Sequence, residues 1–204
     1  MPKDKTASHV KIVAAAKAGF LEKGFEGAST RSIGERAGMS AAALYRHYRD
    51  KEAMFDSLVL PVIELMEQWM EEHKKLKYGL AAQKAEGNVL FGQTVTDLIK
   101  EVVYPHRLEF HLLLGCAQGT KYENFIHDFV AQQQVELTDA IHFMKQQGYQ
   151  VEEPSQEELH MLLSAYMTAG FEPVVHNYSQ ENTMHCLDTI NKFFMPGWKK
   201  IMGL

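Results

Sequence analysis

The chain has 204 residues, enough for one small domain and one larger helical domain, and its formal net charge is −5. Its two cysteines, Cys116 and Cys186, are too few for a disulfide framework and are expected to be buried free thiols. No run approaches the ~18 apolar residues of a membrane span, and the polar start MPKDKTASH does not resemble a signal peptide. These features predict a cytoplasmic protein.

The charge is divided unevenly along the chain. Residues 1–51 contain ten Lys or Arg and five Asp or Glu, a net charge of +5, so residues 52–204 carry −10. A basic end on an acidic protein is typical of binding to a polyanion such as DNA.

Residues 29–38 predict a short helix followed by a tight turn. Ser29 and Thr30 are suitable N-caps, because a side-chain oxygen can accept from a free amide of the first turn. Ile33 and Ala37 then share one face of the helix, and Gly38 supplies the permissive backbone that the turn needs.

Residues 40–51 predict a second short helix and the start of a third. Ser40 is expected to cap a helix that runs through Leu44 to Tyr48. Asp50 can cap the following helix, where Lys51 gains nothing from the helix dipole and is expected to find another partner, such as a DNA phosphate. The pair of helices is typical of a helix-turn-helix, although an ordinary helical hairpin would show the same periodicity. The charge distribution favours the DNA-binding interpretation.

A set of positions in residues 10–56 forms a pattern that extends beyond this motif. They are Ile12, Ala15, Ala16, Phe20, Gly24, Phe25, Thr30, Ile33, Ala37, Gly38, Ser40, Leu44, Tyr45, His47, Tyr48, Lys51, Glu52 and Phe55. The pattern resembles the N-terminal domain of TetR/AcrR-family transcriptional regulators. The resemblance implies a three-helix DNA-binding domain over residues 1–52 and a helical bundle for ligand binding and dimerisation over residues 53–204. It also implies a non-enzymatic homodimeric repressor that binds a palindromic operator and is released by a small effector.

The candidate DNA contacts lie on the two short helices. We expect base readout from Thr30, Arg31, Ser40 and Arg46, and only methyl contacts from Ala41 and Ala42. The resemblance implies that Tyr45, His47 and Lys51 bind phosphates. Relatives often carry a polar side chain where this chain has its alanines, so more of the sequence preference is left to DNA shape. Gly34 replaces a usual alanine, which should loosen the first motif helix by about 1 kcal/mol.

The remainder of the chain predicts helices and no sustained alternation of a strand, so the expected fold is all-α. The expected helices cover residues 51–77, 88–103, 106–117, 121–147, 154–177 and 180–194, with a loop at residues 78–87. Pro105 and Pro196 are expected to end the helices before them.

The resemblance implies a ligand cavity and a dimer interface in the second domain. Apolar walls suit an aromatic or lipophilic effector, and no cofactor is expected. The candidate ligand residues, which would equally well form ordinary core, are Met66, Trp69, His111, Phe125, Phe129 and Tyr166. The last two helices would pair with a second subunit, helped by small residues at Ser164, Ala165, Thr168, Ala169 and Gly170, unless these pack inside one subunit.

Three alternatives remain open from the sequence. A metal- or haem-sensing regulator is suggested by ten histidines and by the pair Glu157 and His160, which share a helix face. The pairs at residues 123/127 and 181/185 are equally explained as surface contacts. A helical-bundle metal enzyme lacks a second Glu-x-x-His, a phosphate loop and a nucleophile elbow, and a helical adaptor would not need the basic N-terminal part.

Overall fold

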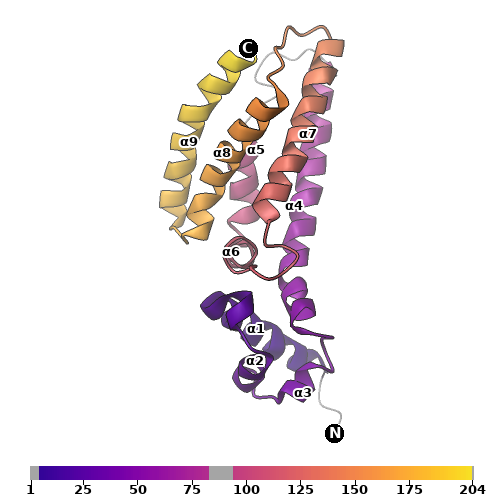
Figure 1. The fold of residues 1–204 in the computed structure, drawn as a ribbon, viewed down its shortest axis with the longest axis vertical. Helices are drawn as coiled ribbons and strands as arrows, with labels where there is room; N and C mark the ends of the chain where they lie inside the picture. The colour runs from indigo at the N-terminus through magenta and orange to yellow at the C-terminus, as the bar shows by residue number, and fades with distance from the viewer. Residues whose placement is uncertain (1–4, 83–93, 204) are drawn as a thin grey trace. The chain divides into compact units, whose positions relative to one another are not determined.

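The computed structural model describes residues 5–82 and 94–203, which form helices joined by short turns, with no strand among them (Figure 1). The all-α fold predicted from the sequence is therefore confirmed. The described residues divide into two compact units. Unit 1 contains the chain up to Glu64 together with His106–Asn124, and unit 2 contains Leu65–Pro105 together with the chain from Phe125 onward. The domain boundary expected from the sequence lies after residue 52. The helix that begins at Lys51 continues through that position.

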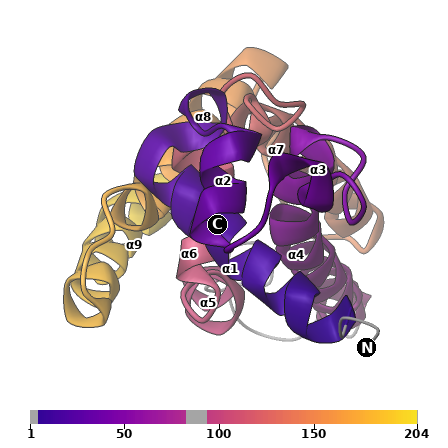
Figure 2. The same ribbon diagram turned by 90° about the horizontal axis from the view of Figure 1, so that it is seen from below.

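Unit 1 is built from α1 (Lys5–Gly27), α2 (Thr30–Arg36), α3 (Ala41–Leu44), the first turns of α4 (Lys51–Ala82) and α6 (Arg107–Gly115). α2 contacts both α1 and α3 (Figure 2). The core of the unit includes side chains with no solvent exposure, namely Ile12, Phe20, Ile33, Leu44, Phe55, Val59, Phe110 and Leu112.

α6 is part of unit 1, although it lies far from the motif in the sequence. Lys17 on α1 forms an ion pair with Glu109 on α6. At the end of α6, the Cys116 carbonyl accepts a hydrogen bond of 2.8 Å from the Phe25 amide. These contacts tie the middle and the end of α1 to residues about 90 positions later, as the separation of Lys17 and Glu109 shows.

Unit 2 contains the rest of α4, α5 (Thr94–Leu98), a π-helical turn η1 (Ile99–Val103), α7 (Phe125–Gln146), α8 (Gln156–Val175) and α9 (Gln180–Ile201). α8 packs against α7 and α9 and also contacts α5 and η1 (Figure 1). Ser155 and Glu158 form a capping box that fixes the start of α8. No described helix combines the length and the apolar character that crossing a membrane requires.

The largest difference from the predicted helices is at the C-terminus, where α9 does not end before Pro196 but continues to Ile201. Proline removes one backbone hydrogen bond from a helix. Beyond it, however, Trp198 and Met202 are almost fully buried, and the Met202 carbonyl accepts a hydrogen bond of 2.9 Å from the Glu152 amide. These tertiary contacts offset the local cost of the proline.

Other predicted boundaries shift by smaller amounts. α4 continues to Ala82, so the first half of the expected loop at residues 78–87 is helical, and residues 83–87 lie outside the described residues. The expected start of the next helix, at residues 88–93, also lies outside them. α3 ends at Leu44, and residues 45–47 form turns in place of the expected helix. α7 begins at Phe125, four residues later than expected.

Candidate DNA interface and ligand cavity

The helix-turn-helix is defined by three caps and one glycine. The Ser29 hydroxyl accepts from the Ser32 amide at 3.1 Å, and the Ser40 hydroxyl accepts from the Ala43 amide at 3.3 Å. The Asp50 carboxylate accepts from the Ala53 amide at 2.7 Å, which is the largest cause of its lowered pKa. Gly38 has a φ of 68°, a backbone conformation that residues with a side chain rarely adopt. All four local features were predicted from the sequence and are confirmed.

Gly34 has a role that helix propensity alone does not reveal. A Cβ at this position would lie 2.9 Å from the Met39 carbonyl oxygen and 3.3 Å from the Ala41 amide nitrogen. Glycine therefore lets α2 approach the turn and the start of α3 closely.

The structure brings two of the predicted DNA contacts together and leaves several others exposed. The Thr30 and Tyr45 hydroxyls lie 3.3 Å apart, so the start of α2 meets the end of α3. The Tyr45 side chain is 51% exposed, and Arg46 and Ala42 are also exposed. Arg31 is exposed as well, and its side chain donates to Glu35 at 3.0 Å.

Other predicted DNA contacts are less available to DNA, because they are half-buried or already hydrogen-bonded within the protein. The Ser40 hydroxyl serves the α3 cap, and Ala41 is half-buried. His47 is half-buried too, with its ring centroid 6.4 Å from that of His9, which stacks on Tyr48 at 5.7 Å.

Lys51 has a partner within the protein. Its ammonium donates to the Phe25 carbonyl at 2.7 Å and to the Ala28 carbonyl at 3.1 Å, and it lies 4.3 Å from the centroid of the Phe25 ring. Carbonyls at the C-terminal end of a helix carry partial negative charge, which favours a cation there. The fold itself thus supplies the partner that the sequence-based argument sought in a DNA phosphate.

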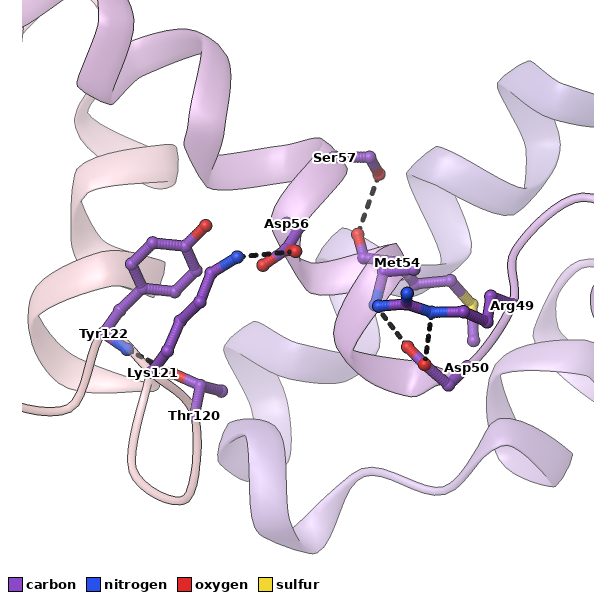
Figure 3. A network of polar contacts seen from close by, with 9 residues as sticks. Arg49, Asp50, Met54, Asp56, Ser57, Thr120, Lys121 and Tyr122 are labelled. Carbon is purple, nitrogen blue, oxygen red and sulfur yellow. Dashed lines mark hydrogen bonds and ion pairs between the residues drawn. The ribbon is translucent and has the colours of Figure 1, made fainter.

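A second polar network holds the start of α4 within unit 1 (Figure 3). Lys121 donates to Asp56 at 2.9 Å, and this hydrogen bond is the largest cause of its raised pKa. Tyr122 is buried beside this pair, and burial raises the pKa of its phenol. The turn after α6 is therefore joined to α4 by charge as well as by packing.

Unit 2 contains a cavity whose empty space, with its open mouth included, is about 880 Å³. Residues of α4, α5, α7, α8 and α9 line it. Three of the predicted ligand residues, Trp69, Phe129 and Tyr166, lie in its wall. Met66 is buried in the same unit and Phe125 is half-buried there, both outside the cavity lining, whereas His111 is on α6 in unit 1.

The cavity also has a polar part, of which the sequence analysis predicted only Tyr166. The members that it missed are His73, Lys74, Lys77, Tyr78, Gln133 and Glu136. Burial raises the pKa of Tyr166 to about 12, and its hydroxyl donates to Asn191 at 3.1 Å. The sequence analysis missed the charged residues for a physical reason. A stripe of apolar residues predicts the buried face of a helix, whereas a charged residue beside the stripe is normally expected to face solvent.

The metal-sensing alternative rests on histidine and carboxylate side chains, whose arrangement the structure shows for the described residues. Among residues 5–82 and 94–203, no group of three or more His, Cys, Asp or Glu side chains is arranged to hold a metal ion. Of the suggested pair, Glu157 is exposed, and the His160 ring interacts with the Gln134 side chain at 3.2 Å.

Comparisons with known proteins agree with this architecture. Residues 12–58 match the family described as bacterial regulatory proteins, tetR family. No curated protein sequence matches the chain.

Solved structures share the fold across nearly the whole chain. One is the transcriptional regulator FadR from Bacillus subtilis in complex with stearoyl-CoA, which is 15% identical with a TM-score of 0.51. The match covers 93% of this chain and 98% of that one. Another is NalD, the secondary repressor of the MexAB-OprM multidrug efflux pump in Pseudomonas aeruginosa, which is 17% identical with a TM-score of 0.51 and 98% coverage of both chains.

Proposed function

We propose that this chain, whose residues 12–58 match the tetR family of bacterial regulatory proteins, is a dimeric repressor that a small molecule releases from a palindromic operator. The observation that carries the proposal is the capped helix-turn-helix with its exposed Arg31, Tyr45 and Arg46. The net charge of +5 on residues 1–51 supports the same conclusion, because phosphate neutralisation dominates affinity for DNA.

Base readout falls to Arg31 and Arg46 in this proposal. Both are exposed, and an arginine can donate two hydrogen bonds to a guanine edge. In this proposal Tyr45, whose hydroxyl lies beside that of Thr30, binds a phosphate, whereas Lys51 acts inside the fold. The roles of Ala41 and Ala42 are limited to apolar contact with thymine methyls.

The DNA-binding proposal is tested by selecting duplexes from a random pool with the purified protein. We expect an inverted repeat whose half-sites lie about one helical turn apart. Arg46→Ala should weaken binding by about 1–3 kcal/mol and relax the preference at one base position. Arg49→Ala removes the same charge from a neighbouring exposed side chain and should weaken all duplexes equally. Failure to enrich any sequence would exclude the proposed function.

Dimerisation through α8 and α9 is supported by their exposed faces. Met161 on α8 is 61% exposed and Phe193 on α9 is 76% exposed, and α8 packs against α9, so two adjacent helices both present large apolar side chains to solvent. Ala165 and Thr168 continue the exposed face of α8, as the spacing from Met161 requires. Gly170 does not belong to this face, because a Cβ there would lie 3.0 Å from Val95 inside the unit.

Sedimentation tests the dimer directly. Phe193→Asp places a charge in the proposed interface and should give monomers, with operator affinity reduced because only one half-site is bound at a time. Val135→Asp, at a position of 62% exposure on α7, is the matched control and should leave the dimer intact. A Phe193→Asp protein that remains dimeric would place the interface elsewhere.

The effector proposal rests on the cavity of unit 2. Aromatic and aliphatic walls with a few polar groups are typical of small-molecule sites. A ligand releases the operator only to the extent that it binds the DNA-free conformation more tightly. Fluorescence anisotropy of labelled operator DNA, measured with candidate lipophilic compounds, tests this step. FadR, which has the same fold, was solved in complex with stearoyl-CoA.

A further inference from the structure

The charged groups of the cavity wall come from two helices. Lys74 and Lys77 on α4 line the cavity together with Glu136 on α7. The Lys74 ammonium lies 3.5 Å from the Glu136 carboxylate, so these two charges neutralise each other. His73 lines the same region, and its Nδ1, in the tautomer that carries the proton there, donates to the Trp69 carbonyl at 2.8 Å.

Lys77 differs from Lys74 in lacking such a partner. Among the described residues, none forms a hydrogen bond or ion pair with its ammonium, and Glu136 acts on it only through longer-range attraction. Burial lowers the pKa of Lys77, so the fold bears a cost for keeping this charge. A half-buried ammonium without a close counter-ion is less favourable than a solvated one unless something else supplies the counter-ion.

We propose that the cavity binds an amphipathic anion, a carboxylate on an apolar body, whose charged end pairs with Lys77 and whose apolar body lies against Trp69, Phe129 and Trp198. All four side chains line the same cavity. The inference specifies the effector class of the proposed function and rests on it.

The arrangement of charges disfavours the other ligand classes. A cation would have to compete with Lys74 for Glu136 and would lie near a second, unneutralised ammonium. A neutral ligand would fill the apolar part but leave Lys77 without a counter-ion. A carboxylate gains a charge-assisted hydrogen bond in a partly desolvated place, where such bonds are strongest.

The chain provides its own reporter for the test. It contains two tryptophans, Trp69 and Trp198, and both line the cavity. Quenching of intrinsic fluorescence in the full-length protein therefore measures occupancy of this site, without DNA. The probes are dodecanoate, methyl dodecanoate and dodecyltrimethylammonium, each titrated below its micellar concentration, with calorimetry to confirm saturable binding.

We expect dodecanoate to bind at least about tenfold more tightly than the ester or the ammonium compound. Lys77→Met should reduce dodecanoate affinity by about the same factor and leave the ester unaffected, whereas Lys77→Arg should retain the preference. Lys75→Met is the matched control, because Lys75 is on the same helix, pairs with Glu71 and lies outside the cavity lining.

The inference is overturned by equal affinity for acid and ester, by preference for the ammonium compound, by unchanged dodecanoate binding in Lys77→Met, or by no saturable dodecanoate binding. Failure of the proposed function gives a different result. In that case the protein selects no DNA sequence, or bound dodecanoate leaves operator affinity unchanged, while the Lys77-dependent preference for the anion persists.

Discussion

Single residues decide whether the DNA-binding motif keeps its shape, and Lys51 is the clearest case. It donates to carbonyls at the end of α1 from the first turn of α4. Lys51→Met should therefore lower the free energy of unfolding by about 1.5–3 kcal/mol, the range for hydrogen bonds to charged groups. Urea denaturation measures this loss, with the exposed Lys23→Met as control.

The salt dependence of DNA binding separates this structural role from a phosphate contact. If Lys51 acts only inside the fold, the slope of log affinity against log salt stays unchanged in Lys51→Met under conditions where the protein is folded. A slope shallower by about 0.9 would instead assign the ammonium to one phosphate.

Gly34 gives a second prediction at this scale, in which sterics oppose helix propensity. An alanine there gains about 1 kcal/mol in helix propensity but brings its Cβ to 2.9 Å from the Met39 carbonyl. Because backbone must move to relieve this contact, we expect Gly34→Ala to destabilise the protein by about 1 kcal/mol overall. Gly79 on α4 has nothing within 4 Å of its Cβ position, so Gly79→Ala should stabilise it. Equal effects in thermal unfolding would show that no such crowding exists.

At the scale of helices, the sequence predicted those features that depend only on residues a few positions away in the chain. The caps at Ser29, Ser40 and Asp50 act over three residues, and Gly38 sets its own turn. Contacts across long separations could not be predicted in this way. Lys51 meets carbonyls more than twenty positions earlier, and the cavity charges meet only when α4 packs against α7.

Pro196 shows the same limit and yields a prediction for α9. The local sterics of proline predict that the helix ends at Pro196. The chain nevertheless stays helical beyond it, where Trp198 is buried. Pro196→Ala restores a backbone hydrogen bond at an exposed position, so we expect the free energy of unfolding to rise by about 1–3 kcal/mol. A lowered melting temperature in calorimetry would mean that Pro196 is itself required by the packing of α9.

Lys77 on α4 makes the stability of the protein depend on pH. Its pKa in the folded state lies below the ordinary 10.5, so between these two values the unfolded chain binds more protons. The free energy of unfolding therefore rises with pH across this window, as the half-buried ammonium loses its charge. Tyr166, whose pKa is raised to about 12, lowers stability only above the ordinary tyrosine value of 10.0.

Urea denaturation of the wild type and Lys77→Met isolates this contribution. Below the window the variant should be the more stable protein, and its advantage should shrink as the pH approaches 10.5. An advantage that does not change with pH would indicate that Lys77 carries no buried charge.

For the whole molecule, the proposed function requires that ligand and operator affect each other equally. Thermodynamic linkage demands that saturating dodecanoate weakens operator binding by the same factor by which saturating operator weakens dodecanoate binding. We expect a factor of about 5–150, the usual range of allosteric coupling. Anisotropy of labelled DNA gives the first quantity.

Tryptophan fluorescence gives the second quantity, because Trp69 and Trp198 both line the cavity of unit 2 and residues 1–64 contain no tryptophan. In Lys77→Met, higher dodecanoate concentrations should be needed for both effects, by one common factor. Unequal factors in the wild type would show that dodecanoate removes the protein from DNA by another route, such as unfolding. Equal factors with a Lys77-dependent midpoint would tie the switch to the anion in this cavity.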